Sequence, residues 1–523
     1  MKIPCKLNVL VAALCCAIQG RAQTGTDVRL RSQRLSACTS SLTARIDARH
    51  ASLNAPVLPA GSMLEVRLLK RVASSDSQVG DAVEAVITTP VSDHGTRLLP
   101  AGGMVSGTVD HIDRLGLGLR HTAATLHLQF TELHLPGETV IPIEAQVAGV
   151  EEARESVTDS GAVIGIHPGA SLSTGVSGVF TLLLAGEPAL RMAVLGFKFL
   201  AARSPDAEIN FPAGTELLLR LTQDVQTHQF ETQTPDVPLL PAREGAAVQN
   251  TLATLPQQQT IDGAKRLSDL VNVALIGTRD AVQRAFVAAG WSSPEAHGVM
   301  AVYHMYHCVA QRAGYRMAPM TNLTLNGRSS DAAFQKSLDT FAKRHHIRLW
   351  HNDSGIWLGA ATEDVSYAIR AMHLTHATER HVDNERAKVV NDLILTGCVD
   401  TGALIPRADF KPAQEDRHSI LTDGDVAILK LNSCEHPTPA ASDPQVTRPS
   451  RTRRALIAIA QDLARSNPVS VGLALTQGLL ANAKTMSQPP VPQAEAYTRA
   501  IAIAKLPEGT FPQSKPAIVL ANR

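Results

Sequence analysis

The strongest constraint on the fold is a turn that occurs three times in the first half of the chain. The turn and its following residues are LPAGSMLEVRLLKRV at 58–72, LPAGGMVSGTV at 99–109 and FPAGTELLLRLTQDV at 211–225. Each Pro-Ala-Gly tripeptide is typical of a tight turn and leads into a short alternation of side chains. In the first copy, Leu64 and Val66 fall on one face of the segment, and Glu65 and Arg67 fall on the other. The repeat predicts half-buried strands that are entered through tight turns.

Further strand-like runs lie between these copies, among them AVEAVITTPV, ATLHLQFTELHL and TVIPIEAQV. Many short strands with turns at this spacing favour a β-barrel or a β-sandwich over residues 55–226. An apolar, glycine-rich insertion at 161–202 interrupts the pattern. It either contacts a membrane or is covered by protein, and the charges of Glu187 and Arg191 within it favour the second alternative.

Residues 264–434 have a mixed helix and strand pattern. The segment LVNVALIG predicts a buried strand, and the apolar periodicity after Thr278 predicts a capped helix that stops at Gly290. Residues 331–342 predict a second helix, and 383–397 predict a third that begins at Asp383 and ends at Gly397. We therefore expect a multidomain protein in which an all-β domain precedes a mixed α/β (α+β) domain.

Three segments lie outside these two domains. Residues 1–22 combine a basic start, a short apolar run and small residues before Gln23, which predicts a cleaved signal peptide. Residues 227–263 lack periodicity and predict a linker, and 435–523 predict a proline-rich, partly helical tail. The signal peptide predicts export, with a periplasmic or outer-membrane-associated location in the cell envelope.

Cysteine content and charge exclude some classes of protein. Beyond the predicted signal peptide, the cysteines are Cys38, Cys308, Cys398 and Cys434, and none forms a CxxC pair, so nothing supports a zinc ribbon. The last three either contribute one disulfide or stay as buried thiols. The net charge of +1 argues against nucleic-acid binding by bulk electrostatics.

The segment RHHIRLWHNDSGIWLGAA at 344–361 predicts a β-hairpin closed through NDSG. With its centre at Asp353-Ser354, Trp350 lies opposite Trp357, and alternation adds Arg344, His346 and Arg348 to the same face. Ile347 and Leu349 then point into a core. This polar, aromatic face either binds an anionic or planar group or packs internally.

The start of the helix at 383–397 supplies a counterpart to the hairpin, because a carboxylate there can pair with a hairpin arginine, as a salt bridge or as part of a site. The candidate binding residues are Arg344, His345, His346, Arg348, Trp350, Trp357, His381, Asp383, Glu385 and Arg386. No catalytic residue is assigned, because the chain has no nucleophile motif, no phosphate-binding loop and no dinucleotide fingerprint.

Histidines are concentrated in the second half of the chain, where His304 and His307, with His297 near their face, and His373 and His376 have helical spacing. Histidine spacing without a carboxylate motif is a weak metal signal, and a polar helix face explains it as well. We expect no cofactor and treat a bound metal as the minor alternative.

The first domain resembles the TrbI-like barrels of bacterial conjugation and envelope-transport proteins over 55–226. The matching features are the repeated Pro-Ala-Gly strands, SSDSQVGDAVEAVITTPV, GTRLLPAGGMVSGTV and the glycine-rich insertion. The resemblance implies a structural part of an envelope-spanning channel, without catalytic residues.

The second domain resembles the LssY C-terminal domain, which is named for a component of type I secretion. The matching segments, over about 265–400, are VNVALIGTRDAVQRAFVAAGW, RHHIRLWHNDSGIWLGAATED and HVDNERAKVVNDLILTGCVD. The family's signature positions fall on Arg344, His345, His346, Arg348, Trp350, Glu385 and Arg386. The resemblance assigns them no catalytic role.

Two functional hypotheses follow. The first is a non-enzymatic cell-envelope protein that serves secretion or envelope assembly through contacts with envelope or secretion-system proteins. The second is a metal-assisted or acid/base hydrolase whose site joins His345 or His346 to His381, Asp383 and Glu385.

Overall fold

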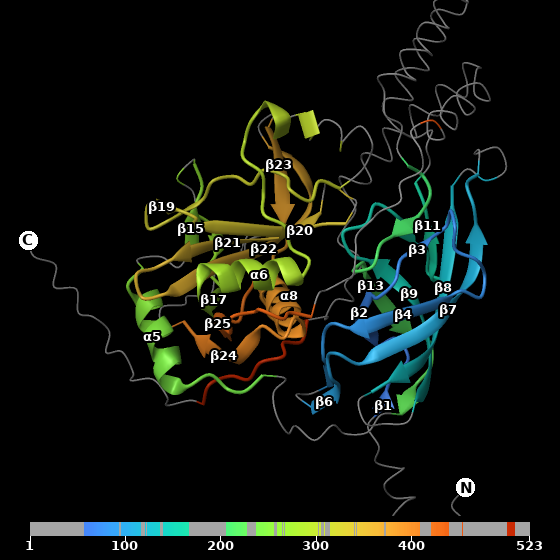
Figure 1. Cartoon of the computed structure of the whole chain (residues 1–523), viewed down its shortest axis with the longest axis horizontal. Helices are drawn as coiled ribbons and strands as arrows, with labels where there is room; N and C mark the ends of the chain where they lie inside the picture. The colour runs from blue at the N-terminus through green and yellow to red at the C-terminus, as the bar shows by residue number, and fades with distance from the viewer. Residues whose placement is uncertain are drawn as a thin grey trace, which may run out of the picture. The chain divides into compact units, whose positions relative to one another are not determined.

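The Pro-Ala-Gly turns begin strands, as the repeat predicts, in a computed structural model of the chain (Figure 1). The carbonyl of Pro59 accepts a hydrogen bond from the Ser62 amide at 3.0 Å, and the carbonyl of Pro212 accepts one from Thr215 at 3.1 Å. The third residue of each turn, Gly61 or Gly214, has a φ of about +90°, which residues with a side chain rarely adopt. The repeated glycine is therefore a conformational requirement of the turn.

The structure describes residues 57–93, 96–116, 121, 123–135, 140–166, 206–226, 237–255, 259–263, 265, 267–301, 303–304, 308, 314–338, 340, 343–370, 373–407, 420–438, 452 and 499–507. Residues 57–523 group into one unit, which contains both the barrel and the α/β domain described below.

The all-β domain is a closed barrel. Six strands follow one another in the order β8-β7-β4-β2-β13-β9, and β9 pairs back onto β8. The barrel strands are β2 (Met63–Leu68), β4 (Ala82–Ile87), β7 (Met104–Asp113), β8 (Thr125–His134), β9 (Ile141–Val150) and β13 (Glu216–Leu221). The short strands are β1 (Val57–Leu58), β3 (Val72–Ala73), β5 (Val91–Asp93), β6 (Thr96–Leu99), β10 (Ser156–Val157), β11 (Ala162–Ile164), β12 (Asn210–Phe211) and β14 (Val225–Gln226). The structure thus selects the barrel over the sandwich.

Alternating apolar side chains fill the barrel, among them Leu64, Val66 and Leu219. The outward-facing side chains of β2 depart from the half-buried strand that alternation predicts. Glu65 and Arg67 are 7% and 2% exposed, because helix α8 (Val382–Leu395) and the segment around Arg499 supply charged partners for this face. Burial on both faces of β2 places charges inside the molecule.

The second domain is built on a mixed sheet in which the strands follow the order β20-β21-β22-β17-β25-β24, with β23 also paired to β22. Its strands are β17 (Val273–Ile276), β20 (Ala332–Lys336), β21 (Arg344–His351), β22 (Ile356–Arg370), β23 (His373–Thr378), β24 (Val399–Pro406) and β25 (Asp425–Leu431). A smaller sheet contains β15 (Gln259–Ile261), β16 (Leu267–Leu270), β18 (Thr324–Leu325) and β19 (Arg328–Ser329).

Helices cover both faces of the large sheet. Side chains of α6 (Arg279–Ala288) and α8 (Val382–Leu395) share one core with Ile347, Leu349 and Trp357. Side chains of α5 (Ala242–Ala253) share the other core with Trp350 and Leu358. The central strands β21 and β22 therefore have no solvent-facing side at the hairpin, which bears directly on the predicted binding face.

The predicted helix ends are mostly confirmed. Thr278 caps α6 by accepting a hydrogen bond from the Ala281 amide at 3.2 Å, and Gly290 follows the helix with a positive φ. Helix α8 ends before Gly397, as predicted, but it begins at Val382, so Asp383 is not its cap. The helix predicted over 331–342 is wrong, because Ala332–Lys336 hydrogen-bonds to β21 as the edge strand β20.

The predicted linker 227–263 contains helix α5 and strand β15. Val248 and Leu252 of α5 are buried in the core of the second domain, which explains why this segment is ordered against the sheet. Within the predicted tail, the Leu404 amide of β24 donates a hydrogen bond to Ala504 at 2.9 Å. Residues 1–22, most of the insertion 161–202 and the helical part of the tail lie outside the described residues.

No helix in the described part of the chain is both long and apolar enough to cross a membrane. The membrane contact predicted for 161–202 stays a prediction, because the described residues stop at 166 and resume at 206.

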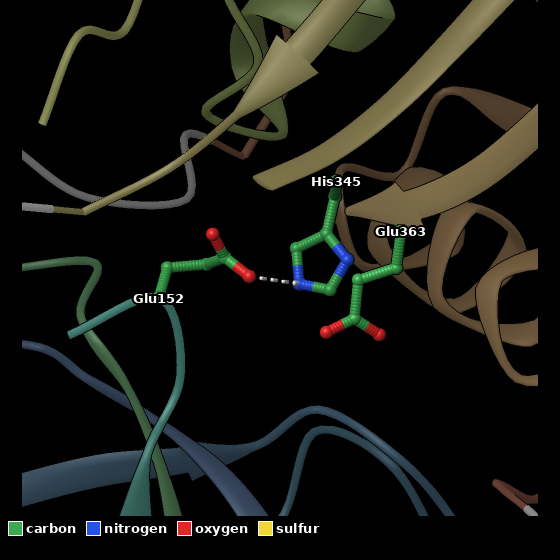
Figure 2. A group of neighbouring side chains, drawn as sticks. All are labelled: Glu152, His345 and Glu363. Atoms are coloured by element: carbon green, nitrogen blue, oxygen red, sulfur yellow. Dashed lines mark ion pairs between the residues drawn. The ribbon is translucent and has the colours of Figure 1, made fainter. Parts of the chain in front are cut away.

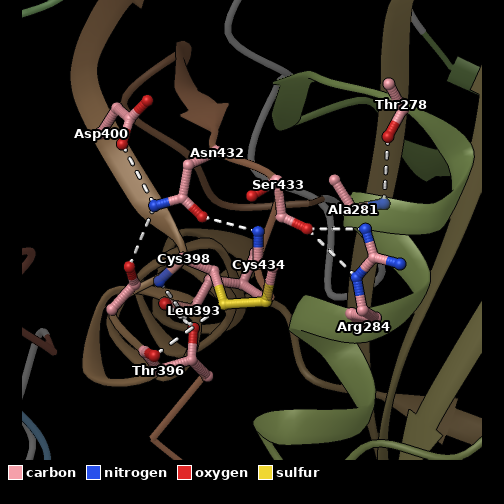
Figure 3. The surroundings of a disulfide bond; sticks show 11 residues. Thr278, Ala281, Arg284, Leu393, Thr396, Cys398, Asp400, Asn432, Ser433 and Cys434 are labelled. Atoms are coloured by element: carbon pink, nitrogen blue, oxygen red, sulfur yellow. Dashed lines mark hydrogen bonds between the residues drawn. A yellow bond between two sulfur atoms is a disulfide. The ribbon is translucent and has the colours of Figure 1, made fainter. Parts of the chain in front are cut away.

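A disulfide joins Cys398 and Cys434, which settles the pairing that the sequence left open (Figure 3). It ties the turn after α8 to the segment that follows β25. Arg284 of α6 donates two hydrogen bonds to the neighbouring Ser433 carbonyl, at 2.6 and 3.1 Å. The disulfide therefore fastens the edge of the sheet next to α6.

Candidate functional site

The predicted hairpin is present, but its register differs by one residue from the prediction. Trp350 lies opposite Leu358, and His351 lies opposite Trp357. The loop contains three residues, because the Asn352 amide donates to the Ile356 carbonyl at 2.9 Å. Gly355 closes this loop with a φ of +78°. A turn followed by a glycine of positive φ is a common hairpin loop, and its odd length moves the centre to Ser354.

The register places the two tryptophans on opposite faces of the sheet. Trp350 packs on the α5 side and donates its indole N–H to Arg328 O at 2.9 Å. Trp357 packs on the α6 and α8 side and donates to Gly277 O at 2.9 Å. Both indoles are almost fully buried. The prediction of a shared, ligand-binding tryptophan face is wrong.

The basic side chains predicted for that face form internal pairs. Arg344 donates to Asp364 at 2.8 Å, and Arg348 donates to Asp269 at 2.8 Å. His346 lies among them, and burial together with the nearby Arg348 lowers the pKa of His346 to about 4 despite the opposing carboxylates. This imidazole is therefore neutral at physiological pH, and the group is a buried structural network.

The start of α8 holds a loop of its own domain. Arg386 makes two parallel hydrogen bonds to the Asp423 carboxylate, both at 2.8 Å, and Asp383 accepts one from Thr422 at 2.7 Å. His381 is exposed. Arg386 and Asp383 therefore fix the segment before β25.

Glu385 is the residue of α8 that reaches the hairpin, and its partner is a histidine instead of the predicted arginine. Glu385 Oε2 lies 2.7 Å from His345 Nδ1, and both side chains are almost fully buried. Because neighbouring residues of a strand point to opposite faces, His346 faces away from this pair. Of the residues in the hydrolase hypothesis, the structure brings together His345 and Glu385.

A charged cluster that the sequence did not reveal surrounds this pair. Arg67 and Glu216 come from the barrel, and Lys336, Lys388 and Asp392 come from the α/β domain. Arg67 pairs with Glu216 and Asp392 at 2.6 and 2.5 Å, and Lys336 pairs with the same two carboxylates at 2.7 and 3.0 Å. Lys388 also pairs with Glu216. We call these five residues the junction cluster.

Glu151 connects the junction cluster to His345. Its carboxylate lies 3.5 Å from Lys388 Nζ and 3.5 Å from His345 Nε2, and it also pairs with Arg499. Arg499 in turn pairs with Glu65 at 2.7 Å. One continuous series of buried charges therefore runs from the outer face of β2 to the hairpin.

The pKa values in this region follow from the balance of burial and charge. Burial opposes ionisation of Glu216 and Asp392, but Lys336 and Lys388 outweigh it and hold the pKa of both carboxyls well below the usual range. Burial also opposes protonation of His345, but Glu385 and Glu151 outweigh it and raise the pKa of the imidazole. Glu216 and Asp392 are thus ionised at neutral pH.

A cavity of about 300 Å³ opens beside these charges. Residues of the barrel, of β20 and of the segment after α6 line it, including Glu151, Glu152, Glu216, Trp291, Lys336 and His345. The Trp291 indole donates to Asp392 at 2.9 Å and closes one side. Among the signature positions predicted from the sequence, His345 therefore lines this cavity.

The histidines that were singled out by their helical spacing do not belong to this site. His297 lies 3.0 Å from Met320 O, and His304 lies 3.3 Å from Glu295. His307 lies outside the described residues, and His373 and His376 fall on strand β23. The acidic residues after β9, Glu151 and Glu152, were the signal available in the sequence, as a carboxylate pair at the end of a predicted strand.

Comparison with known proteins gives two findings. Residues 252–426 match the family described as the LssY C-terminus. The structure of ComB10 of the Com type IV secretion system of Helicobacter pylori is similar to 34% of this chain and 97% of its own length, at 12% identity and a TM-score of 0.19. A likeness at that level establishes neither a shared fold nor a shared function. No curated protein matches the chain.

The family match covers α8, the hairpin and most of the large sheet, which are the elements that carry His345 and Glu385. It agrees with the resemblance that the sequence motifs indicate. Residues 252–426 of this chain are therefore similar to the LssY C-terminal domain.

Proposed function

We propose that this chain is an exported cell-envelope protein that acts through protein contacts, with its barrel and its LssY C-terminal domain held as one body. The junction cluster is the observation that supports this most. It joins side chains of both domains in a buried network, and a buried charge that loses its partner is costly. A rigid two-domain body suits a component that positions other proteins.

Export is supported by the disulfide between Cys398 and Cys434, because disulfides persist mainly in oxidising compartments. The signal peptide expected at 1–22 agrees with this. The family's association with secretion adds a link to envelope transport.

The chain segment between α6 and β18 carries exposed apolar side chains that offer a surface for protein contacts. Val299, Met300 and Met317 are 86%, 61% and 50% exposed, and Tyr303 is exposed nearby. Exposed apolar side chains mark interaction sites when they form one contiguous patch, and the closeness of these residues in the chain supports such a patch. We call these four residues the apolar segment surface.

Photo-crosslinking in the native host tests this proposal. A crosslinking amino acid at Met300 is expected to capture an envelope protein, whereas one at Val79 of the barrel, which is 64% exposed, serves as the matched control. Fractionation of the untagged protein should recover it with the envelope. A freely soluble monomer that yields no crosslink at Met300 would contradict the proposal.

A hydrolase is the second candidate, because the His345–Glu385 pair opens onto a cavity. A histidine held by a carboxylate is a common general base. Ester and phosphoester substrates should then be hydrolysed by the wild type and not by His345→Gln, while binding at the apolar segment surface stays intact. Absence of turnover over a broad substrate panel would count against this candidate.

A further inference from the structure

Three side chains lie close together in Figure 2, and two of them, Glu152 and His345, line the cavity. Glu152 follows strand β9 of the barrel, and His345 and Glu363 lie directly opposite each other on β21 and β22. One nitrogen of His345 and one oxygen of each glutamate lie within 4.8 Å of one another. The group therefore draws its members from both domains.

Two polar atoms of these side chains lack hydrogen-bond partners among the described residues. His345 Nε2 and Glu152 Oε2 are both buried without such a partner. His345 is 2% exposed and Glu152 is 6% exposed, so bulk water does not solvate them freely. Buried polar atoms are satisfied in nearly all native proteins, so these two indicate a binding partner.

Glu385 gives His345 the orientation that a metal ligand needs. A carboxylate accepts hydrogen bonds, so its 2.7 Å contact places the imidazole proton on Nδ1 when His345 is neutral. The lone pair of Nε2 is then available to a cation on the side where Glu152 Oε1 lies 3.8 Å and Glu151 Oε2 lies 3.5 Å away. Metal-bound histidines commonly have a carboxylate in the position of Glu385.

The charge balance also favours a cation here. In the neighbouring network, the cations Arg67, Lys336, Lys388 and Arg499 are matched by Glu65, Glu151, Glu216 and Asp392. Besides Glu151, which belongs to that network, His345 faces the three carboxylates of Glu152, Glu363 and Glu385, and Lys343 is the further cation acting on Glu152. This surplus of carboxylates is largely shielded from solvent.

We propose that Glu152, His345 and Glu363 bind one divalent transition-metal ion, with Glu385 holding His345 in position and the cavity leaving one side of the ion open. One imidazole and two carboxylates suit Zn²⁺, Mn²⁺ or Fe²⁺, whereas Mg²⁺ and Ca²⁺ prefer oxygen ligands alone. Tetrahedral ligands at about 2.0–2.2 Å from zinc are about 3.5 Å apart, so the glutamates need to move by about an ångström.

A bound metal ion would crosslink the barrel and the LssY C-terminal domain, because Glu152 belongs to the barrel whereas His345 and Glu363 belong to the LssY C-terminal domain. This inference does not depend on export or on a protein partner. A metal bound only by the folded state stabilises that state, so its binding is measurable without any activity.

The experiment uses the full mature chain after dialysis against a chelator. Zn²⁺ or Mn²⁺ is added back, with Mg²⁺ as the hard-cation comparison, and bound metal is measured by elemental analysis and calorimetry. The variants are Glu152→Gln and Glu363→Gln. Glu155→Gln is the matched control, because Glu155 is a buried glutamate three residues from Glu152 with an oxygen lacking a hydrogen-bond partner and lies outside the group.

The wild type and Glu155→Gln should bind about one equivalent of Zn²⁺ or Mn²⁺, and each of the other two variants should bind at least about tenfold more weakly. Without metal, those two variants should melt at or above the wild-type temperature, because each removes a surplus carboxylate. With metal, the order should reverse. The proposal fails if the folded wild type binds no stoichiometric transition metal, or if both variants bind it as well as the wild type does.

Discussion

His345 and His346 are neighbours in the chain and have opposite electrostatic surroundings. Burial and Arg348 lower the pKa of His346 to about 4, whereas Glu385 overcomes burial and raises the pKa of His345. Successive residues of β21 point to opposite faces, so one histidine enters a site where arginines and aspartates are paired and the other a site rich in glutamate. The pKa values of two identical neighbouring residues are therefore shifted in opposite directions.

Arg348 provides the residue-scale prediction. Arg348→Ala should destabilise the protein by about 3–5 kcal/mol, because it leaves the buried carboxylate of Asp269 without its cation. Denaturant unfolding of the single variants and of Arg348→Ala/Asp269→Ala measures the coupling.

Arg328→Ala is the control, since the Arg328 side chain is 62% exposed and its ion pair with Asp331 is long, at 3.7 Å. Its effect should stay within about 0.5 kcal/mol. Equal losses from Arg348→Ala and Arg328→Ala would show that the buried pair adds nothing.

At the scale of elements, turns and caps were the parts of the fold that the sequence could predict. The Pro-Ala-Gly turns and the Thr278 cap depend on a few adjacent residues, so their chemistry is visible locally. The hairpin register is different, because Asn352 to Gly355 suits both an even and an odd loop. Alternation could not decide between them, since β21 has apolar residues facing both cores.

Gly355→Ala tests the odd loop. A Cβ at this position meets no atom within 4 Å, so the cost comes from its φ of +78° and should be about 1–2 kcal/mol. Gly263→Ala is the control, because it also meets nothing within 4 Å and has no positive φ. Thermal unfolding of the two variants separates the effects, and equal melting temperatures would argue against the left-handed conformation at Gly355.

The disulfide gives a second prediction at this scale. Cys398 and Cys434 are 36 positions apart, and closing a loop of that length in the unfolded chain is worth about 4 kcal/mol in the chain-entropy treatment. Cys398→Ser/Cys434→Ser should therefore lose about 2–4 kcal/mol, and a reductant should lower the melting temperature of the wild type but leave that of the variant unchanged. A reductant that shifts neither would contradict the bond.

The whole molecule carries a network that no local pattern could predict. Arg67 meets Glu216 across 149 positions and Asp392 across 325 positions. Alternation assigned Glu65 and Arg67 to the polar side of a half-buried strand, and only the packing of a second domain buries them. The candidate site shares this limit, because its signature residue His345 was visible whereas the barrel residues Glu151 and Glu152 belong to another domain.

Acid should unfold the protein through the junction cluster. Glu216 and Asp392 have folded-state pKa values below their ordinary values of 4.5 and 3.8. A depressed pKa stabilises the folded state above the ordinary value, and this stability is lost as the pH falls through the folded value. The melting temperature should therefore stay level down to about pH 5 and then fall steeply toward pH 2.

Glu216→Gln should melt at a lower temperature than the wild type at pH 7, because three cations lose a shared carboxylate. Its melting temperature should also depend less on pH below about 4.5, since one of the titrating groups is gone. Parallel curves for the two proteins from pH 7 to pH 2 would remove Glu216 from the explanation.

The short pairing of β1 with β14 sets Val57 opposite Gln226, so the chain enters and leaves the barrel at adjacent points. Domains with adjacent ends can be inserted into a gene, or removed from it, as a cassette without stretching the flanking chain. The buried charges of the barrel restrict its exchange for another domain. A replacement barrel without counterparts of Arg67 and Glu216 would leave Lys336 and Lys388 with Asp392 as the one carboxylate of the junction cluster, and therefore with an excess of buried positive charge, so the two halves of the gene are expected to evolve together.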